Sequence, residues 1–202
     1  KESFLTQLDS GEIVDVNNGL SCLLKLQQVL SGFLPSAEEG ENVEFAEDRI
    51  HQLMEIINQS EGQAIVWARF THDILKITDK LNKEFGAGSA VCYYGDNVDE
   101  RGDNYSLFLK EKVRFFVANP RAGGTGLNLQ KSGCQTVIYY SNNFNYIDRA
   151  QSEDRTHRMG MKGAVTYFDI VANKSVDLHI LKNLQSKKSL SSLKASVLLS
   201  LL

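Results

Sequence analysis

Two arginines in the last quarter of the chain have the spacing of a phosphate clamp. Arg155 and Arg158 stand three positions apart in the run from Gln151 to Gly160. If this run is helical, both guanidinium groups project from one face and can reach the same triphosphate. An arginine supplied to a transferring phosphoryl group can raise the rate by roughly 10³ to 10⁵. The alternative is that both arginines are surface partners of Glu153 and Asp154.

A glycine-rich segment precedes the two arginines. It runs from Ala118 to Gln130, follows an apolar run and is expected to open a helix, so backbone amides can approach phosphates closely. The segment is not a Walker A loop, because no Gly-Lys-Ser/Thr follows, and it lacks the GxGxxG fingerprint of dinucleotide-binding proteins. No Walker A sequence occurs anywhere in the 202 residues. The chain alone is therefore not expected to hold a nucleotide in the P-loop manner.

Short apolar runs alternate along the chain with segments of helical periodicity. This alternation predicts an α/β fold with a parallel sheet, covered by helices on both faces and joined by right-handed crossovers. In such folds ligands meet the loops at the carboxyl ends of the strands. The predicted strands are residues 64–68, 89–94, 113–118, 136–140 and 164–170, and the predicted helices are 20–30, 48–59, about 72–85 and about 177–181.

Composition and charge narrow the function classes. With 42% hydrophobic residues the chain can bury a substantial core. The net charge of −3 divides unevenly: residues 1–120 hold 11 Lys/Arg against 20 Asp/Glu, and residues 121–202 hold 11 against 5, which gives −9 and +6. The basic part fits a surface that meets phosphates, and a solvated basic face is the equal alternative.

Neither a metal site nor a membrane segment is indicated. Cys22, Cys92 and Cys134 form no CxxC pair and are interpreted as buried free thiols, and the four histidines lack metal-ligand spacing. No apolar run approaches the roughly 18 to 20 residues that span a bilayer, and the first residues lack a signal segment. An intracellular protein is expected, and the missing initiator Met suggests a fragment of a longer one.

The order of these motifs resembles the C-terminal RecA-like lobe of superfamily-two helicases, most closely that of Swi/Snf-type DNA translocases. The resemblance covers about residues 20–182 and implies a RecA-like, three-layer lobe over 46–182. A helical entry segment over 1–45 and an amphipathic brace helix over 183–202 are expected on either side. The motifs are Arg69-Phe70-Thr71 after a strand, Gly95-Asp96 with Arg101 and Phe108, Arg121 to Leu129, and Gln151 to Gly160.

The resemblance also assigns roles to individual positions. Arg155 and Arg158 match the arginine fingers of the family. Gln151, Gly126 and Asn128 match the nucleotide side of the cleft between two lobes. The positions that match contacts to nucleic acid are Arg69, Phe70, Thr71, Gly95, Gly123, Gly124 and Thr125. For the loop at Arg69 and for Gly95, ordinary turn residues are the alternative.

The implied function is that of one half of an ATP hydrolase. ATP, with Mg²⁺, would be held by an N-terminal RecA-like lobe of the same protein, and the partner would be double-stranded DNA. The resemblance favours translocation without unwinding over strand separation, and the sequence itself leaves both open. The isolated lobe is expected to be inactive, and no membrane is involved. The compartment is the cytoplasm of a bacterial or phage-infected cell, or the nucleus in a eukaryote.

Two alternatives stay open at this point. One is a non-catalytic RecA-like module that binds DNA or protein. The other is an unrelated α/β enzyme, such as a nucleotide-sugar transferase, which would need a catalytic acid or a carboxylate pair. The acidic cluster Asp96, Asp99, Glu100 and Asp103 could imitate such a pair, but we interpret it as solvated surface in a Gly/Asn loop.

The sequence departs from the family pattern at two places. Met161 stands where the family usually has Gln, and Ser141 to Asn145 replaces an acidic residue and Trp-Asn-Pro. The pair Phe144-Asn145 is associated with translocases of phage and bacterial type. The sequence therefore predicts that type and does not indicate chromatin as a substrate.

Overall fold

The chain divides into two compact units. One unit is Asp48–Val171, and the other combines Lys1–Glu47 with Ala172–Leu202. The computed structural model describes residues 4–7, 13–16, 19–36, 42–122, 127–156 and 164–186.

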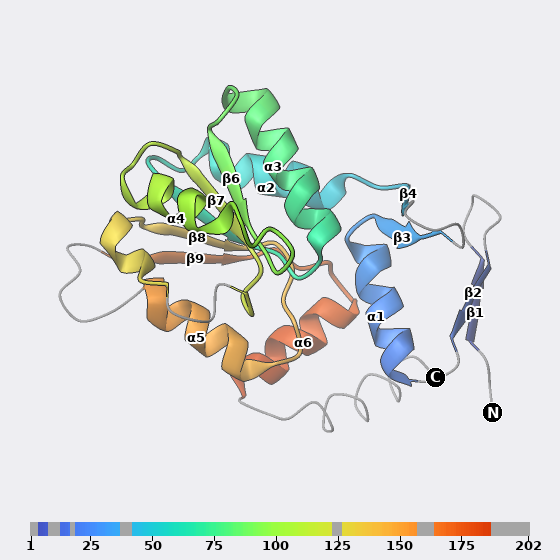
Figure 1. Ribbon diagram of the computed structural model, residues 1–202. Helices are drawn as coiled ribbons and strands as arrows, with labels where there is room; N and C mark the ends of the chain where they lie inside the picture. The colour runs from blue at the N-terminus through green and yellow to red at the C-terminus, as the bar shows by residue number, and fades with distance from the viewer. Residues whose placement is uncertain are drawn as a thin grey trace. The chain divides into compact units, whose positions relative to one another are not determined.

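The unit Asp48–Val171 is built on a five-stranded parallel sheet with the order β6-β7-β5-β8-β9 (Figure 1). In β5, β7 and β8 every residue is buried, as expected for parallel strands covered on both faces. All five predicted strands are confirmed to within two residues at each end. Their bounds are β5 Ala64–Trp67, β6 Ala90–Tyr93, β7 Phe115–Ala118, β8 Thr136–Tyr139 and β9 Thr166–Asp169.

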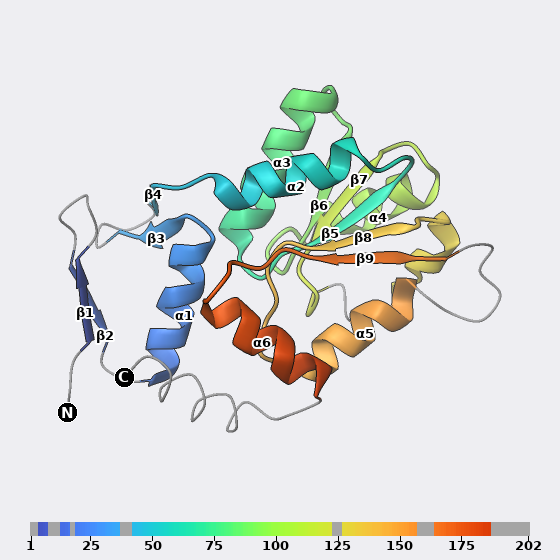
Figure 2. The same cartoon turned by 180° about the vertical axis from the view of Figure 1, so that it is seen from behind.

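Helices cover both faces of this sheet, which confirms the predicted three-layer arrangement (Figures 1 and 2). On one face Ile77 of α3 packs with Val66 of β5, and α2 adds further apolar side chains. On the other face Phe108 of α4 packs with Ile65 of β5. Successive residues of β5 thus point to opposite faces of the sheet and pack in the two different hydrophobic cores. The bounds are α2 Asp48–Asn58, α3 Thr71–Phe85, α4 Arg101–Leu109, the 3₁₀ helix η1 Leu129–Ser132 and α5 Tyr146–Thr156.

The second unit contains two helices and two antiparallel strand pairs. Helices α1 and α6 contact each other, and both are confirmed as helices where the sequence predicts them. Ser175 caps α6, because its hydroxyl accepts a hydrogen bond from the Asp177 N–H. The bounds are β1 Phe4–Gln7, β2 Ile13–Val16, α1 Gly19–Leu30, β3 Phe33–Pro35, β4 Asn42–Glu44 and α6 Val176–Gln185.

Several elements differ from the sequence-based expectation. The sequence does not predict the strand pairs β1-β2 and β3-β4, nor α4, whose first turn holds Asp103. The glycine-rich segment leads into a four-residue 3₁₀ helix rather than an α-helix, and Gly133, with φ of 70°, ends it in the left-handed conformation. The predicted brace helix lies largely outside the described residues, and the predicted domain boundaries stay a prediction.

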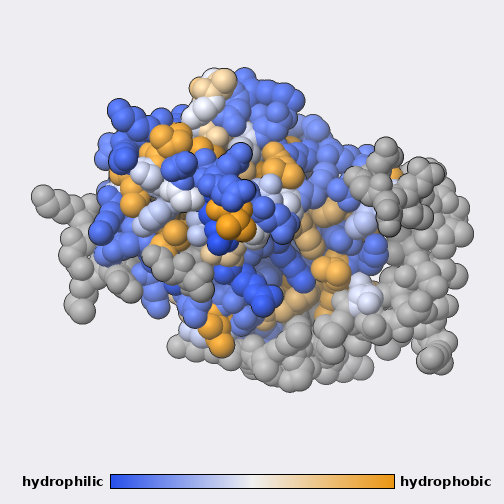
Figure 3. All heavy atoms as spheres, viewed as in Figure 1, coloured by the Kyte–Doolittle hydropathy of each residue, from blue (hydrophilic) through white to orange (hydrophobic). Residues whose placement is uncertain are grey.

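The surface of the described part is largely hydrophilic. Figure 3 shows hydrophobic residues on one face in separate groups among hydrophilic ones. Among the described helices, none has the length and apolar character needed to cross a membrane. Of the three cysteines, Cys134 is buried, whereas Cys22 and Cys92 are half-buried; all three are free thiols.

Candidate functional site

Three loops that carry the predicted motifs follow neighbouring strands. They come after β5, β7 and β8, and β5 lies between the other two in the sheet. The helices that follow β5 and β8 pack on opposite faces, so the chain diverges from two adjacent strand ends (Figures 1 and 2). Such a divergence at the carboxyl edge is where α/β folds place a ligand crevice. Motifs distant in the sequence therefore meet at one edge.

Arg155 joins the helix α5 to the end of the glycine-rich segment. Its Nη1 donates a hydrogen bond of 3.1 Å to the carbonyl oxygen of Leu127. The N–H of Asn128 donates to the Tyr105 hydroxyl at 2.8 Å, so the same point is also tied to α4. Gln151 is exposed on α5 and lies one turn before Arg155, on the same side of the helix. The structure thus brings Arg155 and Asn128 together.

Arg69 is fixed mainly through its backbone. Its N–H donates to the Ser141 hydroxyl at 2.9 Å, and its carbonyl accepts from Asn119 Nδ2 at 2.7 Å. The guanidinium carbon lies 5.3 Å from the ring centroid of Phe70 and 4.9 Å from that of Phe144. Burial lowers the pKa of Arg69 to about 10, so the side chain stays cationic at neutral pH. The loops after β5, β7 and β8 are therefore connected here.

The remaining predicted nucleic-acid residues differ in their surroundings. Phe70 is the N-cap residue of α3, and Thr71 is exposed in its first turn. Gly95 is exposed after the edge strand β6, which β7 separates from β5. A Cβ at Gly95 would meet no atom within 4 Å, and its φ is not in the left-handed region. Nothing in the described structure requires glycine at that position.

Five predicted site residues lie outside the described residues, and their roles stay predictions. The same holds for the expectation that Arg155 and Arg158 share a helix, because α5 ends at Thr156 and the description resumes at Ala164. These five residues are Gly123, Gly124, Thr125, Gly126 and Arg158.

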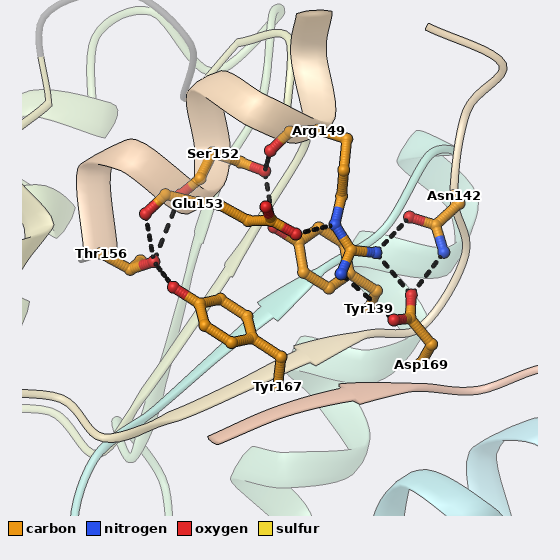
Figure 4. A network of polar contacts seen from close by, with 8 residues as sticks. All are labelled: Tyr139, Asn142, Arg149, Ser152, Glu153, Thr156, Tyr167 and Asp169. Atoms are coloured by element: carbon orange, nitrogen blue, oxygen red, sulfur yellow. Dashed lines mark hydrogen bonds and ion pairs between the residues drawn. The ribbon is translucent and has the colours of Figure 1, made fainter. Parts of the chain in front are cut away.

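A network around Arg149 was not predicted from the sequence (Figure 4). Arg149 donates to both oxygens of Asp169, from Nη1 at 2.5 Å and from Nη2 at 3.1 Å. Nη1 also donates to Asn142 Oδ1 at 3.0 Å. Nε donates to Glu153 Oε1 at 2.5 Å. The guanidinium carbon lies 3.4 Å from the ring centroid of Tyr139. Burial lowers the pKa of Arg149, but the bond to Asp169 and the neighbouring negative groups outweigh it and raise the pKa above its ordinary value.

Two further side chains of α5 bond to strands beneath it. The Ser152 and Tyr139 hydroxyls lie 2.6 Å apart, and the Thr156 and Tyr167 hydroxyls lie 3.0 Å apart (Figure 4). Two sequence signals could have indicated the network. Arg149 and Glu153 have the i,i+4 spacing of a helical ion pair. Asp169 is a charged residue near the carboxyl end of a predicted strand, directly after Tyr167-Phe168.

The acidic cluster is solvent-exposed. Asp96, Asp99, Glu100 and Asp103 are all exposed, which confirms the interpretation as solvated surface, although Asp103 belongs to a helix rather than a loop. Within the described residues, no group of three or more His, Cys, Asp and Glu side chains is placed to hold a metal ion.

Three features define an α/β lobe of the RecA-like class. They are the sheet order, the helices on both faces, and the helix α5, which follows β8 in the chain and carries Arg149 and Arg155. Within that class, the chain belongs to the family of helicase conserved C-terminal domains, whose model matches residues 48–160, more than half of the chain.

Relatives and a solved structure agree with this assignment. The chain is 28% identical over 148 residues to the ATP-dependent helicase fft3 of Schizosaccharomyces pombe. The aligned residues are 70% of this chain and 15% of the relative. It is 26% identical over 198 residues to the protein CHROMATIN REMODELING 4 of Arabidopsis thaliana. This alignment includes 91% of this chain and 9% of the relative. The chain therefore spans only a small part of these relatives.

A crystal structure of the C-terminal part of the Fun30 ATPase domain shares the fold, with a TM-score of 0.57 and 23% identity over 70% of this chain and 45% of that one. The predicted C-terminal lobe of a Swi/Snf-type helicase is thus confirmed. The predicted phage or bacterial type is not supported, because the two relatives come from a fission yeast and a plant.

Proposed function

We propose that this chain is the second lobe of an ATP-dependent DNA translocase. ATP and Mg²⁺ are bound by an N-terminal RecA-like lobe, and Arg155 and Arg158 reach the γ-phosphate when the two lobes close. The loops after β5 and β7 hold the DNA backbone. The observation that carries the proposal is the bond from Arg155 to Leu127. It joins the residue expected at the γ-phosphate to the end of the glycine-rich segment, where Gly126 and Asn128 are expected on the nucleotide side, directly after the positions expected at the DNA.

The Arg155 contact suits a residue that changes partner during a cycle. A hydrogen bond from guanidinium to a neutral carbonyl is weaker than one to a charged phosphate oxygen. Exchange of the Leu127 carbonyl for a γ-phosphate oxygen would therefore give Arg155 a stronger hydrogen bond. The exchange would remove one of two bonds described at the end of the glycine-rich segment, while the bond from the Asn128 N–H to the Tyr105 hydroxyl remains. Nucleotide binding and the conformation of that segment would thus be linked through the Arg155 side chain.

The DNA side of the proposal is supported by Arg69 and by the charge of the chain. A guanidinium held between two rings at the sheet edge is pre-positioned for a phosphate, and residues 121–202 carry the +6 balance. The family resemblance favours translocation along duplex DNA without strand separation, and strand separation is the alternative. Of the relatives described, only the plant protein has a name that points to chromatin.

DNA-stimulated ATP hydrolysis by the two-lobed protein tests the finger assignment. We expect Arg155→Ala and Arg158→Ala each to lower kcat by roughly 10³-fold or more, because each removes charge stabilisation in the transition state. Lys83→Ala is the control, since Lys83 is exposed on α3 and pairs only with its helical neighbour Asp79 among the ion pairs described. Undiminished activity in both arginine variants would overturn the assignment.

The alternative of a non-catalytic binding module makes a different prediction in the same experiment. Under that alternative the two-lobed protein binds DNA, but DNA does not raise its rate of ATP hydrolysis. The compartment stays a prediction, and the eukaryotic origin of the two relatives favours the nucleus over the cytoplasm of a bacterial or phage-infected cell.

A further inference from the structure

We propose that Arg149 is a positioning residue for ATP hydrolysis: it fixes the rotation of α5 about its own axis and so aligns Arg155 with the nucleotide. The inference rests on the proposed function, because it requires Arg155 to act on ATP. Arg149 itself would touch neither nucleotide nor DNA. Its action would pass through the helix that carries both residues.

The guanidinium of Arg149 connects α5 to two strand ends. Asp169 is the last residue of β9, and Asn142 lies in the loop after β8. Asp169 accepts two bonds from Arg149 in the fork-to-fork arrangement, and Asn142 accepts a third. Asn142 Nδ2 also donates to Asp169 Oδ1 at 2.7 Å, which closes the group into a ring of contacts. The start of α5 is therefore attached to the carboxyl edge of the sheet at two points.

The fourth bond of Arg149 orients the guanidinium from within the helix. Nε donates to Glu153, one turn further along α5, while the flat face of the guanidinium lies on the Tyr139 ring (Figure 4). The Arg149 side chain is only 11% exposed, and that of Asp169 is 19% exposed. A lysine offers a single point charge and cannot reproduce this planar fork. The site is thus specific for arginine in both geometry and charge.

Three anchors on one stripe determine the rotation of α5. Arg149, Ser152 and Thr156 are spaced by three and four residues, so they face the sheet together, and each bonds to a strand residue or strand end. Gln151 and Arg155 form a neighbouring stripe, roughly 100° around the helix from the first. Because the anchoring stripe is fixed, the direction in which Arg155 leaves the helix is fixed as well.

A buried ion pair contributes little net stability compared with apolar packing, but it does impose one geometry. An apolar residue at position 149 could fill the space over Tyr139 without tying α5 to Asp169 and Asn142. The helix would then remain packed while its rotation became less well defined. Misplacement of a catalytic group by about 1 Å can cost on the order of 100-fold in rate.

The first test compares Arg149→Met and Arg149→Lys in the two-lobed protein. We expect Arg149→Met to lower kcat of DNA-stimulated ATP hydrolysis by roughly 10- to 100-fold, with the KM for ATP changed by less than about 3-fold. Arg149→Lys should lie between it and the wild type. An unchanged kcat for Arg149→Met, in protein shown to be folded by circular dichroism, would overturn the inference.

Arg114→Met is the matched control. Arg114 is also half-buried, donates to the carbonyls of Gly62 and Ser60 at 3.0 and 2.9 Å, and lies 4.8 Å from the Phe115 ring centroid. It precedes β7 and so belongs to the opposite, amino-terminal edge of the sheet. We expect Arg114→Met to lower the melting temperature as Arg149→Met does, but to leave kcat unchanged below that temperature. An equal loss of kcat in both variants would assign Arg149 a merely structural role.

The double variant Arg149→Met/Arg155→Ala gives the sharpest readout. If Arg149 acts through Arg155, the double variant has the kcat of Arg155→Ala alone, because a missing finger cannot be misplaced. A further loss by the full factor of Arg149→Met would contradict the inference. If Arg155→Ala and Arg158→Ala both retain wild-type activity, the proposed function fails; if only Arg149→Met retains it, the positioning role alone fails.

Discussion

Arg69 and Arg149 show how one residue type is used in two ways at the same sheet edge. Burial lowers the pKa of Arg69 to about 10, and two aromatic rings lie beside its guanidinium. The carboxylate of Asp169 instead helps to raise the pKa of Arg149. A phosphate bound beside Arg69 would favour the charged form and shift its pKa upward again. Arg149 donates to the carboxylates of Asp169 and Glu153 within the fold, which suits it to a structural task.

Replacing Arg69 by alanine should weaken DNA binding without collapsing its loop, because the bonds to Ser141 and Asn119 come from the Arg69 backbone. We expect lower affinity for every DNA sequence and a slope of log K against log salt that is smaller by about 1. Fluorescence anisotropy of labelled duplex DNA at several salt concentrations measures both. Lys83→Ala removes the same charge from α3, away from these loops, and an equal effect of the two variants would argue against a specific contact.

At the scale of elements, the turn between α1 and β3 depends on a glycine. Gly32 has a φ of 85°, and a Cβ there would lie 2.1 Å from the carbonyl oxygen of Ala46. We expect Gly32→Ala to destabilise the protein by more than about 1 kcal/mol, since both the backbone conformation and the space are unsuitable. Urea unfolding followed by circular dichroism measures this change.

Gly102→Ala serves as the opposite case in the same measurement. Gly102 lies within α4 and is exposed, and a Cβ at this position would meet no atom within 4 Å. Alanine should stabilise the helix there by up to about 1 kcal/mol. A Gly32→Ala protein as stable as the wild type would show that the turn adopts another conformation in solution.

The sequence predicted the elements that have strong patterns and missed those that depend on tertiary contacts. The five strands are apolar and bounded by turn residues, so their type and position could be recognised. Helix α4 contains Gly102, Asp103 and Asn104, which favour turns, and it forms because Phe108 is buried in the core. The strands of the second unit are about as short as those of the sheet, but each mixes apolar residues with polar residues or proline, so no continuous apolar run marks them.

The candidate site was predictable in its location but not in its internal contacts. Strand ends identify the loops that meet, and residue types indicate what these loops can bind. The partners of Arg149 come from two different strand ends, 7 and 20 residues away, and no local pattern links them. The bond between Arg155 and Leu127 likewise depends on how α5 packs against η1.

At the scale of the whole molecule, catalysis should require a second lobe. The 202 residues contain no Walker A sequence, so we expect the purified chain to release no phosphate from ATP above the blank, with or without DNA. Supplying the N-terminal lobe in the same polypeptide should restore DNA-stimulated release. Colorimetric phosphate detection is sufficient for both measurements. A DNA-stimulated rate from the chain alone would contradict the two-lobe proposal.

The sheet order also has a consequence for how the chain is synthesised. β5 is the central strand, yet it is made first, and its partners in β7 and β8 follow later: Ala64 pairs with Phe115 and then with Thr136. At about 5 to 20 residues per second, the second partner emerges roughly 4 to 14 seconds after the first strand residue. Until β7 emerges, roughly 3 to 10 seconds after Ala64 at the same rate, this wholly apolar strand has neither neighbour. The same topology that gathers the motifs at one edge thus leaves apolar surface and unpaired strand edges exposed in the nascent lobe, which favours aggregation.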